Sequence, residues 1–215
     1  MVISPFRWLQ RMKQSRGHGI HSPFAFDLIT RVFRSPYSCY AFQDIKKVLS
    51  ESGLDAGLIN EFNYLSYRLV DHFKPKHILE INSGMGVNTL FLTAPASDSC
   101  CTCVEADAEA AAIAKQLQLK KGIISEQLPL LPAGGEKRYN ALFVYLNEKK
   151  PITIETLMAL SHENCFWVFY PLNSRWSKQY WRNIVNDERA RITFDKRDTG
   201  IVSLRFTYNK LHYYV

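Results

Sequence analysis

The stretch that decides the fold is His77-Ile78-Leu79-Glu80-Ile81-Asn82-Ser83-Gly84-Met85-Gly86-Val87-Asn88-Thr89. It starts after Pro75 as a short apolar strand, passes through a turn with two glycines, and continues from Val87 as a helix. The glycines let the backbone approach a ligand closely, and Asn82 tolerates a left-handed conformation. The order strand, glycine turn, helix predicts the first unit of a parallel sheet, with helix-start amides that face an anionic group.

Apolar strands alternate with helices from this unit to the end of the chain. We expect further strands at 101–104, 122–126, 139–146, 166–170, 191–195, 201–206 and 211–215, and helices at 87–93, 108–119, 152–160 and 176–185. The last two strands, joined by Thr207-Tyr208-Asn209-Lys210, are expected to pair as an edge hairpin. The fold class is therefore α/β: a doubly wound, mostly parallel sheet with an antiparallel C-terminal strand.

Residues 1–73 have helical patterns instead. Ser22-Pro23 resembles a helix cap followed by proline at the first helical position, and residues 58–73 repeat apolar side chains every three or four positions. We therefore expect two parts, an N-terminal helical extension or lid over residues 1–73 and an α/β domain over residues 74–215.

Composition and charge exclude several classes of protein. The 215 residues are 47% hydrophobic and 22% charged, which is typical of a globular protein that needs no disulfide or structural metal. The longest apolar run, 165–170, is too short to span a membrane, and the N-terminus lacks a secretory pattern. Five cysteines, an odd number, favour reduced thiols. We expect a cytoplasmic protein without a membrane partner.

The net charge of +7 is concentrated at the two ends of the chain. Residues 1–50 contain eight Lys or Arg and two Asp or Glu, whereas residues 51–173 contain ten and fourteen. The basic residues form no dense cluster with interleaved aromatic residues, so the pattern does not favour a nucleic-acid partner.

A carboxylate follows the second expected strand, in Val104-Glu105-Ala106-Asp107. In nucleotide-binding sheets, a carboxylate about 20 residues after the glycine turn holds the ribose hydroxyls. Asp107 is well placed to cap the helix that starts at Ala108, so Glu105 is the ribose candidate. A turn and a cap without any ligand remain the alternative.

These features resemble the class I S-adenosylmethionine-dependent methyltransferases. The resemblance covers residues 77 to about 146 and the later strands, and extends to a bacterial subgroup through Arg16-Gly17-His18-Gly19-Ile20-His21-Ser22-Pro23, Thr199-Gly200-Ile201 and Lys210-Leu211-His212-Tyr213. It implies a Rossmann-like fold, S-adenosylmethionine as cofactor, and methyl transfer to oxygen or nitrogen of a small molecule. The cofactor-binding residues that it implies are Glu80 for the amino group, Asn82, Ser83, Gly84 and Gly86 around the methionine part, Glu105 for ribose, and Ala106 and Glu126 near adenine.

Departures from the family pattern bear on the mechanism. Asn82 replaces a glycine of the turn, and Asn147 and Asn173 follow the fourth and fifth strands, where metal-dependent members of the family need carboxylates. We therefore expect no metal. These losses also motivate the alternative that the chain is a non-catalytic partner protein with a methyltransferase fold.

Three further groups of residues bear on the chemistry. His18 and His21 could act as a catalytic base if their segment closes over the acceptor, although a structural arm is equally compatible with the sequence. Cys100, Cys101 and Cys103 lack metal-site spacing and are expected to be small core residues. Aromatic residues around 167–181 are expected either to pack in the core or to form a wall for a substrate.

Overall fold

The computed structural model describes residues 5–35, 39–95, 98–123, 125–133 and 138–215. Helices occupy much of the first third of the chain and then alternate with strands. The helices are α1 (Pro5–Gln14), α2 (Pro23–Asp27), η1 (Leu28–Phe33), α3 (Tyr40–Glu51), η2 (Ala56–Leu58), α4 (Glu61–Phe73), α5 (Val87–Thr93), α6 (Ala108–Lys121), α7 (Ile154–Leu160) and α8 (Arg175–Asn186).

Eight strands form one sheet in the order β3-β2-β1-β4-β5-β7-β6-β8. The strands are β1 (His77–Ile81), β2 (Cys100–Val104), β3 (Ser125–Leu128), β4 (Tyr139–Tyr145), β5 (Ser161–Tyr170), β6 (Ile192–Lys196), β7 (Thr199–Ser203) and β8 (Leu211–Tyr214). All neighbouring pairs are parallel except β5 with β7 and β6 with β7. The strand order reverses between β1 and β4, the position at which open α/β sheets bind ligands.

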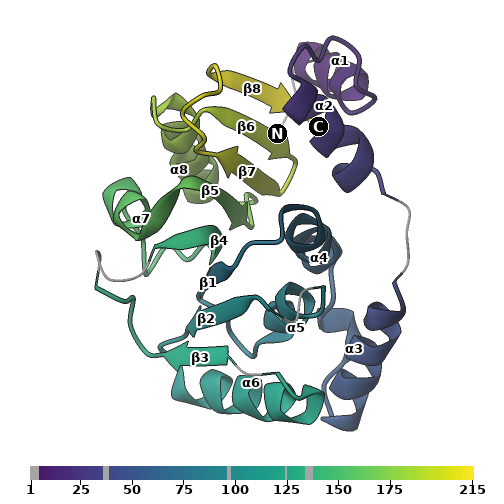
Figure 1. The fold of residues 1–215 in the computed structure, drawn as a ribbon, viewed down its shortest axis with the longest axis vertical. Helices are drawn as coiled ribbons and strands as arrows, with labels where there is room; N and C mark the ends of the chain where they lie inside the picture. Colours follow the sequence, from purple (N-terminus) through teal and green to yellow (C-terminus); the bar gives the residue numbers. More distant parts are fainter. Residues whose placement is uncertain (1–4, 36–38, 96–97, 124, 134–137) are drawn as a thin grey trace.

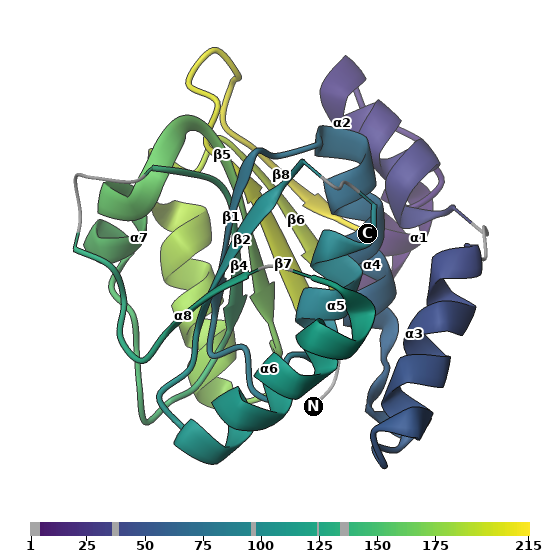
Figure 2. The same ribbon diagram turned by 60° about the horizontal axis from the view of Figure 1, so that its bottom comes forward.

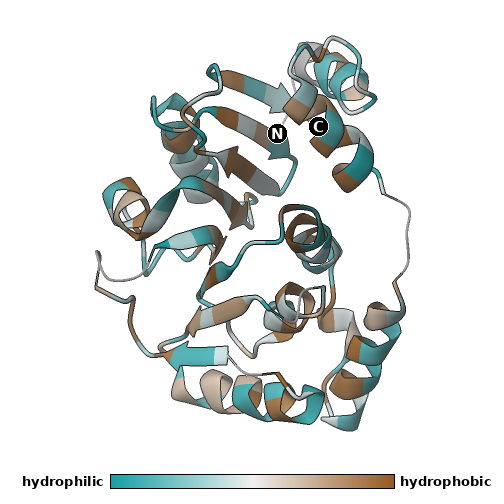
Figure 3. Ribbon diagram, viewed as in Figure 1, coloured by the Kyte–Doolittle hydropathy of each residue, from teal (hydrophilic) through white to brown (hydrophobic). Residues whose placement is uncertain are grey.

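Helices cover both faces of the sheet, so the expected α/β class is confirmed. Figure 2 shows α7 and α8 on one side of the strands, with α4, α5 and α6 on the other. The apolar strand β1 matches its expected range, 77–81, and α5 matches 87–93. In Figure 3, α3 and α6 carry both brown and teal residues, as helices with one packed and one exposed face do.

The end of the chain differs from the sequence-based expectation. The last two strands do not pair with each other, because β8 lies beside β6 and parallel to it (Figure 1). The hairpin is formed by β6 and β7 instead, through the turn at Arg197, which has φ 57°. The loop between β7 and β8 therefore crosses over β6, and the turn-like residues 207–210 form part of that crossing loop.

The N-terminal helices form one layer of the same core. Buried residues of α2, η1 and α4 pack with one face of strands β1, β2, β4, β5, β6, β7 and β8 in a single apolar cluster. Phe33 of η1, for example, meets Phe194 of β6 edge-on at 5.3 Å between ring centroids. The Ser22 cap is also present, because its side chain accepts a hydrogen bond from the amide of Ala25 at 3.2 Å. Within the described residues, no helix is long and apolar enough to cross a bilayer.

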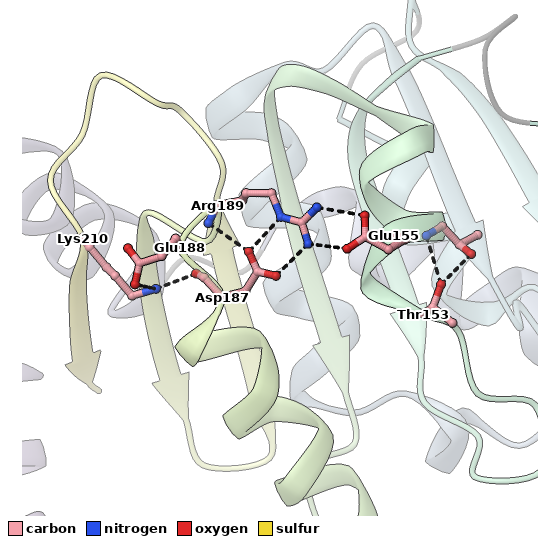
Figure 4. A network of polar contacts seen from close by, with 7 residues as sticks. Thr153, Glu155, Asp187, Glu188, Arg189 and Lys210 are labelled. Carbon is pink, nitrogen blue, oxygen red and sulfur yellow. Dashed lines mark hydrogen bonds and ion pairs between the residues drawn. The ribbon is translucent and has the colours of Figure 1, made fainter.

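A network of charged side chains joins α7 to the loop that follows α8 (Figure 4). The guanidinium of Arg189 contacts the carboxylate of Glu155 at 2.7 Å and that of Asp187 at 2.8 Å. Lys210 adds a contact with Glu188 at 3.7 Å and donates to the backbone carbonyl of Asp187. The network links three segments that are distant in sequence.

Candidate functional site

The turn between β1 and α5 lies at the carboxyl end of the sheet and adopts left-handed conformations. Asn82, Gly84 and Gly86 have φ values of 58°, 55° and 78°. Asn82 thus adopts the backbone geometry that the sequence allowed for, and its side chain donates to the carbonyl of Tyr145 at 2.8 Å. A Cβ built on Gly84 would have no neighbour within 4 Å, whereas one on Gly86 would lie 2.8 Å from Cβ of Ala114. Gly86 is therefore required by helix packing, and Gly84 faces open space.

Glu105 holds this turn from the end of β2. Its carboxylate accepts hydrogen bonds from the amide of Gly84 at 2.8 Å and from the amide of Asp107 at 2.9 Å. Asp107 caps α6 by accepting from the amides of Glu109 and Ala110. A carboxylate oxygen can accept more than one hydrogen bond, so each oxygen of Glu105 can still accept another beside the turn.

Glu80 is buried behind the turn, with 4% of its surface exposed. Its carboxylate accepts from the amide of Asn88 at 3.0 Å and from the hydroxyl of Thr89 at 2.5 Å. Burial raises the pKa of Glu80 from 4.5 to about 7, and the hydrogen bonds from Thr89 and Asn88 offset part of that increase. Among the described residues, no ion pair joins Glu80 to a basic side chain.

A chain of buried amides extends from Glu80 to α4, and the sequence analysis did not identify it. The side-chain amide of Asn63 donates to Asn88 at 3.1 Å, and Asn63 in turn accepts from the amide of Asn60 at 2.8 Å. Asn60 and Asn63 form the capping box of α4. The signal in the sequence was an asparagine followed three positions later by another polar residue at a helix start.

Two cavities open at this end of the sheet and share Asn82 and Tyr145 as lining residues. The first, about 150 Å³, lies between the start of α4 and the ends of β1 and β4. The second, about 280 Å³, lies beyond β4 and β5 and reaches the start of α8. The first is lined by Leu58, Asn60, Phe62, Asn63, Glu80, Ile81, Asn82, Ser83, Met85, Val87, Asn88, Phe143 and Tyr145, and the second by Asn82, Tyr145, Leu146, Asn147, Glu148, Pro171, Asn173, Ser174, Trp176 and Ser177.

The hydroxyl of Ser83 is a buried polar atom without a hydrogen-bond partner in the part of the chain that the structure describes. It lines the first cavity next to the open space at Gly84. Buried polar atoms are usually satisfied, so an unpaired hydroxyl at a cavity wall fits a polar ligand. Gly84, Glu105 and Ser83 together give the turn the features of a binding site.

Aromatic rings surround the point where the two cavities meet. Phe62 of α4 stacks on Tyr170 at 4.6 Å between ring centroids, and Tyr170 meets Tyr145 edge-on at 5.4 Å. Trp176 lines the second cavity, while Trp167 and Trp181 are buried in the core. Core packing is therefore confirmed for Trp167 and Trp181, and a substrate wall at Trp176 stays a prediction. Asn147 and Asn173, the residues that replace family carboxylates, are brought together in the second cavity.

Glu126 is not at the end of its strand. β3 begins at Ser125 and ends at Leu128, two residues later than expected, and Glu126 accepts a hydrogen bond from Thr102 at 3.0 Å on the neighbouring strand. The residue that reaches the site edge is Leu128, whose carbonyl accepts from the amide of Glu105 at 3.0 Å. Glu126 therefore lies partway along an edge strand rather than at its end, and its role at the adenine stays a prediction.

His18 and His21 line neither cavity. Their segment packs at the β8 end of the sheet, where Gln14 accepts from the amide of Tyr214 and Phe24 meets Tyr208 at 4.8 Å. Ile20 and Phe24 pack against the apolar cluster that contains α4 and the last strands, and the catalytic role of His18 and His21 stays a prediction.

Cys101 and Cys103 are buried next to Glu80, as expected of core residues, while Cys100 is exposed. The two thiols and the carboxylate place three ligand atoms within 4.8 Å of one another. Cys103 lies 3.8 Å from Oε2 of Glu80, and the hydrogen bond with Cys103 and burial raise the pKa of Cys101 well above its usual value. The contacts of Cys103 with Glu80 and of Cys101 with Cys103 make both thiols part of the hydrogen-bonded surroundings of Glu80.

No family model and no curated protein sequence matches this chain. Solved structures do match. An O-methyltransferase from Bacillus cereus in complex with S-adenosylhomocysteine is 14% identical, with a TM-score of 0.60 over 80% of this chain and 93% of that one. The O-methyltransferase TomG from Streptomyces achromogenes, in complex with S-adenosylmethionine, is 14% identical, with a TM-score of 0.59 over 94% and 99%. The S-adenosylhomocysteine-bound methyltransferase PaMTH1 from Podospora anserina is 14% identical, with a TM-score of 0.56 over 95% and 97%. The likeness shows the fold, and this chain has the Rossmann-like fold of these methyltransferases.

Proposed function

We propose that this protein is an S-adenosylmethionine-dependent methyltransferase that acts on an oxygen or nitrogen of a small molecule. The observation that carries the proposal is the turn at Gly84, which Glu105 holds open beside a cavity at the point where strand order reverses. Two of the structurally similar methyltransferases are described in complex with S-adenosylhomocysteine and a third with S-adenosylmethionine, which supports the same ligand here.

The residues around the turn divide the recognition of the cofactor between them. Gly84 gives the methionine part of the cofactor room to approach the backbone, and the unpaired hydroxyl of Ser83 offers it a hydrogen bond. Glu105 accepts from the ribose hydroxyls with the acceptor capacity that the two amides leave free. Ala106, the next residue, flanks the adenine. Glu80 faces the amino group.

S-adenosylmethionine supplies a methyl group on a positively charged sulfur. Transfer of this methyl group from the sulfur to the acceptor is an in-line displacement that leaves S-adenosylhomocysteine, and the protein chiefly aligns the two reactants and excludes water. The second cavity, with Tyr145 and Trp176 in its walls, is the place for the acceptor. Asn147 and Asn173 present amides there, where a magnesium site needs carboxylates, so we propose a reaction without a metal.

Glu148 and Tyr145 are the ionisable groups that line the second cavity. His18 and His21 are exposed and line neither cavity, so an acceptor in the second cavity that must lose a proton has few bases in the cavity lining. This observation favours a second candidate function, a methyltransferase-fold partner protein that binds the cofactor or has lost it.

Two measurements separate these functions. Calorimetry of the full chain with S-adenosylhomocysteine is expected to show one site with micromolar affinity. Transfer of labelled methyl groups to a panel of phenols, amines and carboxylic acids then tests turnover. Binding without turnover on any acceptor supports the partner protein, and absence of binding contradicts the cofactor assignment.

A further inference from the structure

Glu80 is a buried acid that is surrounded by neutral groups. α5 presents the amide of Asn88 and the hydroxyl of Thr89, β2 presents the thiols of Cys101 and Cys103, and Phe143 is the paired residue on β4. A buried carboxylate without a cation is costly, so this environment favours the neutral acid. The pKa of about 7 has the same cause.

The first cavity lacks a positive charge of its own. Its lining contains asparagines, apolar side chains, the hydroxyls of Ser83 and Tyr145, and Glu80 as its single carboxyl group, without any lysine, arginine or histidine. A ligand that brings a cation therefore meets only one group that can become its counter-ion. The amide chain from Asn63 through Asn88 fixes the position of that group.

We propose that Glu80 is protonated in the ligand-free protein near neutral pH and loses this proton when a ligand ammonium group enters the first cavity. The inference rests on the proposed function, because the ammonium group is that of the methionine part of the cofactor. The O–H bond of the carboxyl group breaks, the proton passes to the buffer, and the ligand's ammonium keeps its own protons. The ammonium group thus replaces the proton that Glu80 loses. The carboxylate and the ammonium group together carry no net charge, as the protonated acid did before.

The hydrogen bonds around Glu80 accommodate both states. Thr89 donates to the ionised carboxylate at 2.5 Å, and a hydroxyl can equally accept from a protonated carboxyl group. The Thr89 hydroxyl lies 3.6 Å from the sulfur of Cys103, which gives it a second partner when it accepts. Asn88 donates to the other oxygen, which remains an acceptor in either state.

The test is isothermal titration calorimetry of the full chain with S-adenosylhomocysteine, in buffers that differ in ionisation enthalpy. The dependence of the observed enthalpy on the buffer gives the number of protons released. We expect about 0.5 proton at pH 7, about 0.9 at pH 6 and about 0.1 at pH 8, from a group that is half protonated near pH 7. Affinity is expected to weaken by up to about tenfold for each pH unit below 6.

Two control variants and one control ligand identify the source of the proton. Glu80→Gln should still bind the ligand, more weakly, with no proton release and a flat pH profile. Cys103→Ala should still release protons, with the release extended to higher pH because Glu80 loses a hydrogen bond that lowers its pKa. 5′-Methylthioadenosine, which lacks the amino-acid part, should bind the parent without proton release, and this ligand keeps the test valid if Glu80→Gln fails to fold.

Each outcome bears on one of the two proposals. If S-adenosylhomocysteine binds the parent without proton release at pH 6 and 7, the proton exchange is wrong and the proposed function stands. Release that persists in Glu80→Gln, or that 5′-methylthioadenosine also causes, likewise overturns the role of Glu80. If S-adenosylhomocysteine does not bind at all, the proposed function itself fails.

Discussion

The surroundings of Glu80 and those of Arg189 satisfy charged groups in opposite ways. Glu80 is 4% exposed, and in the part of the chain that the structure describes its hydrogen-bond donors are neutral. Arg189 has a side chain that is 44% exposed and pairs with two carboxylates in the network of Figure 4. The first group has a strongly changed proton affinity and no counter-ion, while the second has several counter-ions and ready access to water.

The two groups therefore affect stability and ligand binding differently. Paired charges at a wet surface contribute little to stability, because water and salt screen them and side-chain entropy opposes them. A buried acid without a partner contributes a strong pH dependence and a place for a cation. The Arg189 network thus joins segments that are distant in sequence, whereas the neutral surroundings of Glu80 are suited to binding a cationic group of a ligand.

The largest expected effect is on stability as a function of pH. Glu80 has a pKa of 4.5 when unfolded and about 7 when folded, so the folded chain keeps this proton up to a higher pH than the unfolded chain does. Between those values, rising pH lowers the free energy of unfolding by about 3 kcal/mol, and the change ends above pH 7. Urea unfolding of the parent and of Glu80→Gln from pH 4 to 8 measures it. If the free energy of unfolding changes equally with pH in the parent and in Glu80→Gln, the pKa of Glu80 is not raised in the folded protein and the contrast with Arg189 is wrong.

Substitution of the two turn glycines should separate binding from folding. Gly84→Val fills the open space at the turn, so we expect about a 100-fold loss of S-adenosylhomocysteine affinity, or ~2.7 kcal/mol. Gly86→Val has a similar backbone cost, but its side chain also strikes Ala114. Thermal unfolding should therefore show the larger drop in melting temperature for Gly86→Val. A folded Gly84→Val protein with parental affinity would contradict the placement of the ligand.

Substitution of Glu105 should weaken binding by a similar or smaller amount. Glu105→Ala removes the acceptor for the ribose and for the amide of Gly84, and we expect it to weaken binding by about 1.5–3 kcal/mol. Glu105→Gln should cost less, because its carbonyl still accepts. Calorimetry with S-adenosylhomocysteine measures both, and Asp107→Ala, which removes only the cap of α6, is the matched control. Equal affinities for the parent and both Glu105 variants would place the ribose contact elsewhere.

The smallest expected effect on stability comes from substitution of Arg189 in the exposed network of Figure 4. Arg189→Ala should change the melting temperature by less than about 2 °C at physiological salt, with a smaller difference in high salt. It should leave S-adenosylhomocysteine affinity unchanged, because Arg189 lines neither cavity. A large loss of stability would show that the network does more than join exposed segments.

Local sequence was enough to determine the elements that form the site. The strand 77–81, the glycine turn and the cap at Asp107 follow from short-range rules on apolar runs, left-handed backbone and helix ends. The two glycines have different roles, however, and only the packing of Gly86 against Ala114 distinguishes them.

Tertiary structure alone decided which distant residues meet. The position of β8 beside β6 depends on a crossing loop, and the place of His18 and His21 depends on where Phe24 finds an apolar surface. The chain Asn63–Asn88–Glu80 spans three elements that no spacing rule connects. The α/β class and the glycine turn could be predicted from the order of residues, because both follow from neighbours along the chain. The charge state of Glu80 follows from burial among neutral groups, which exists only once β1, β2, α4 and α5 have packed together.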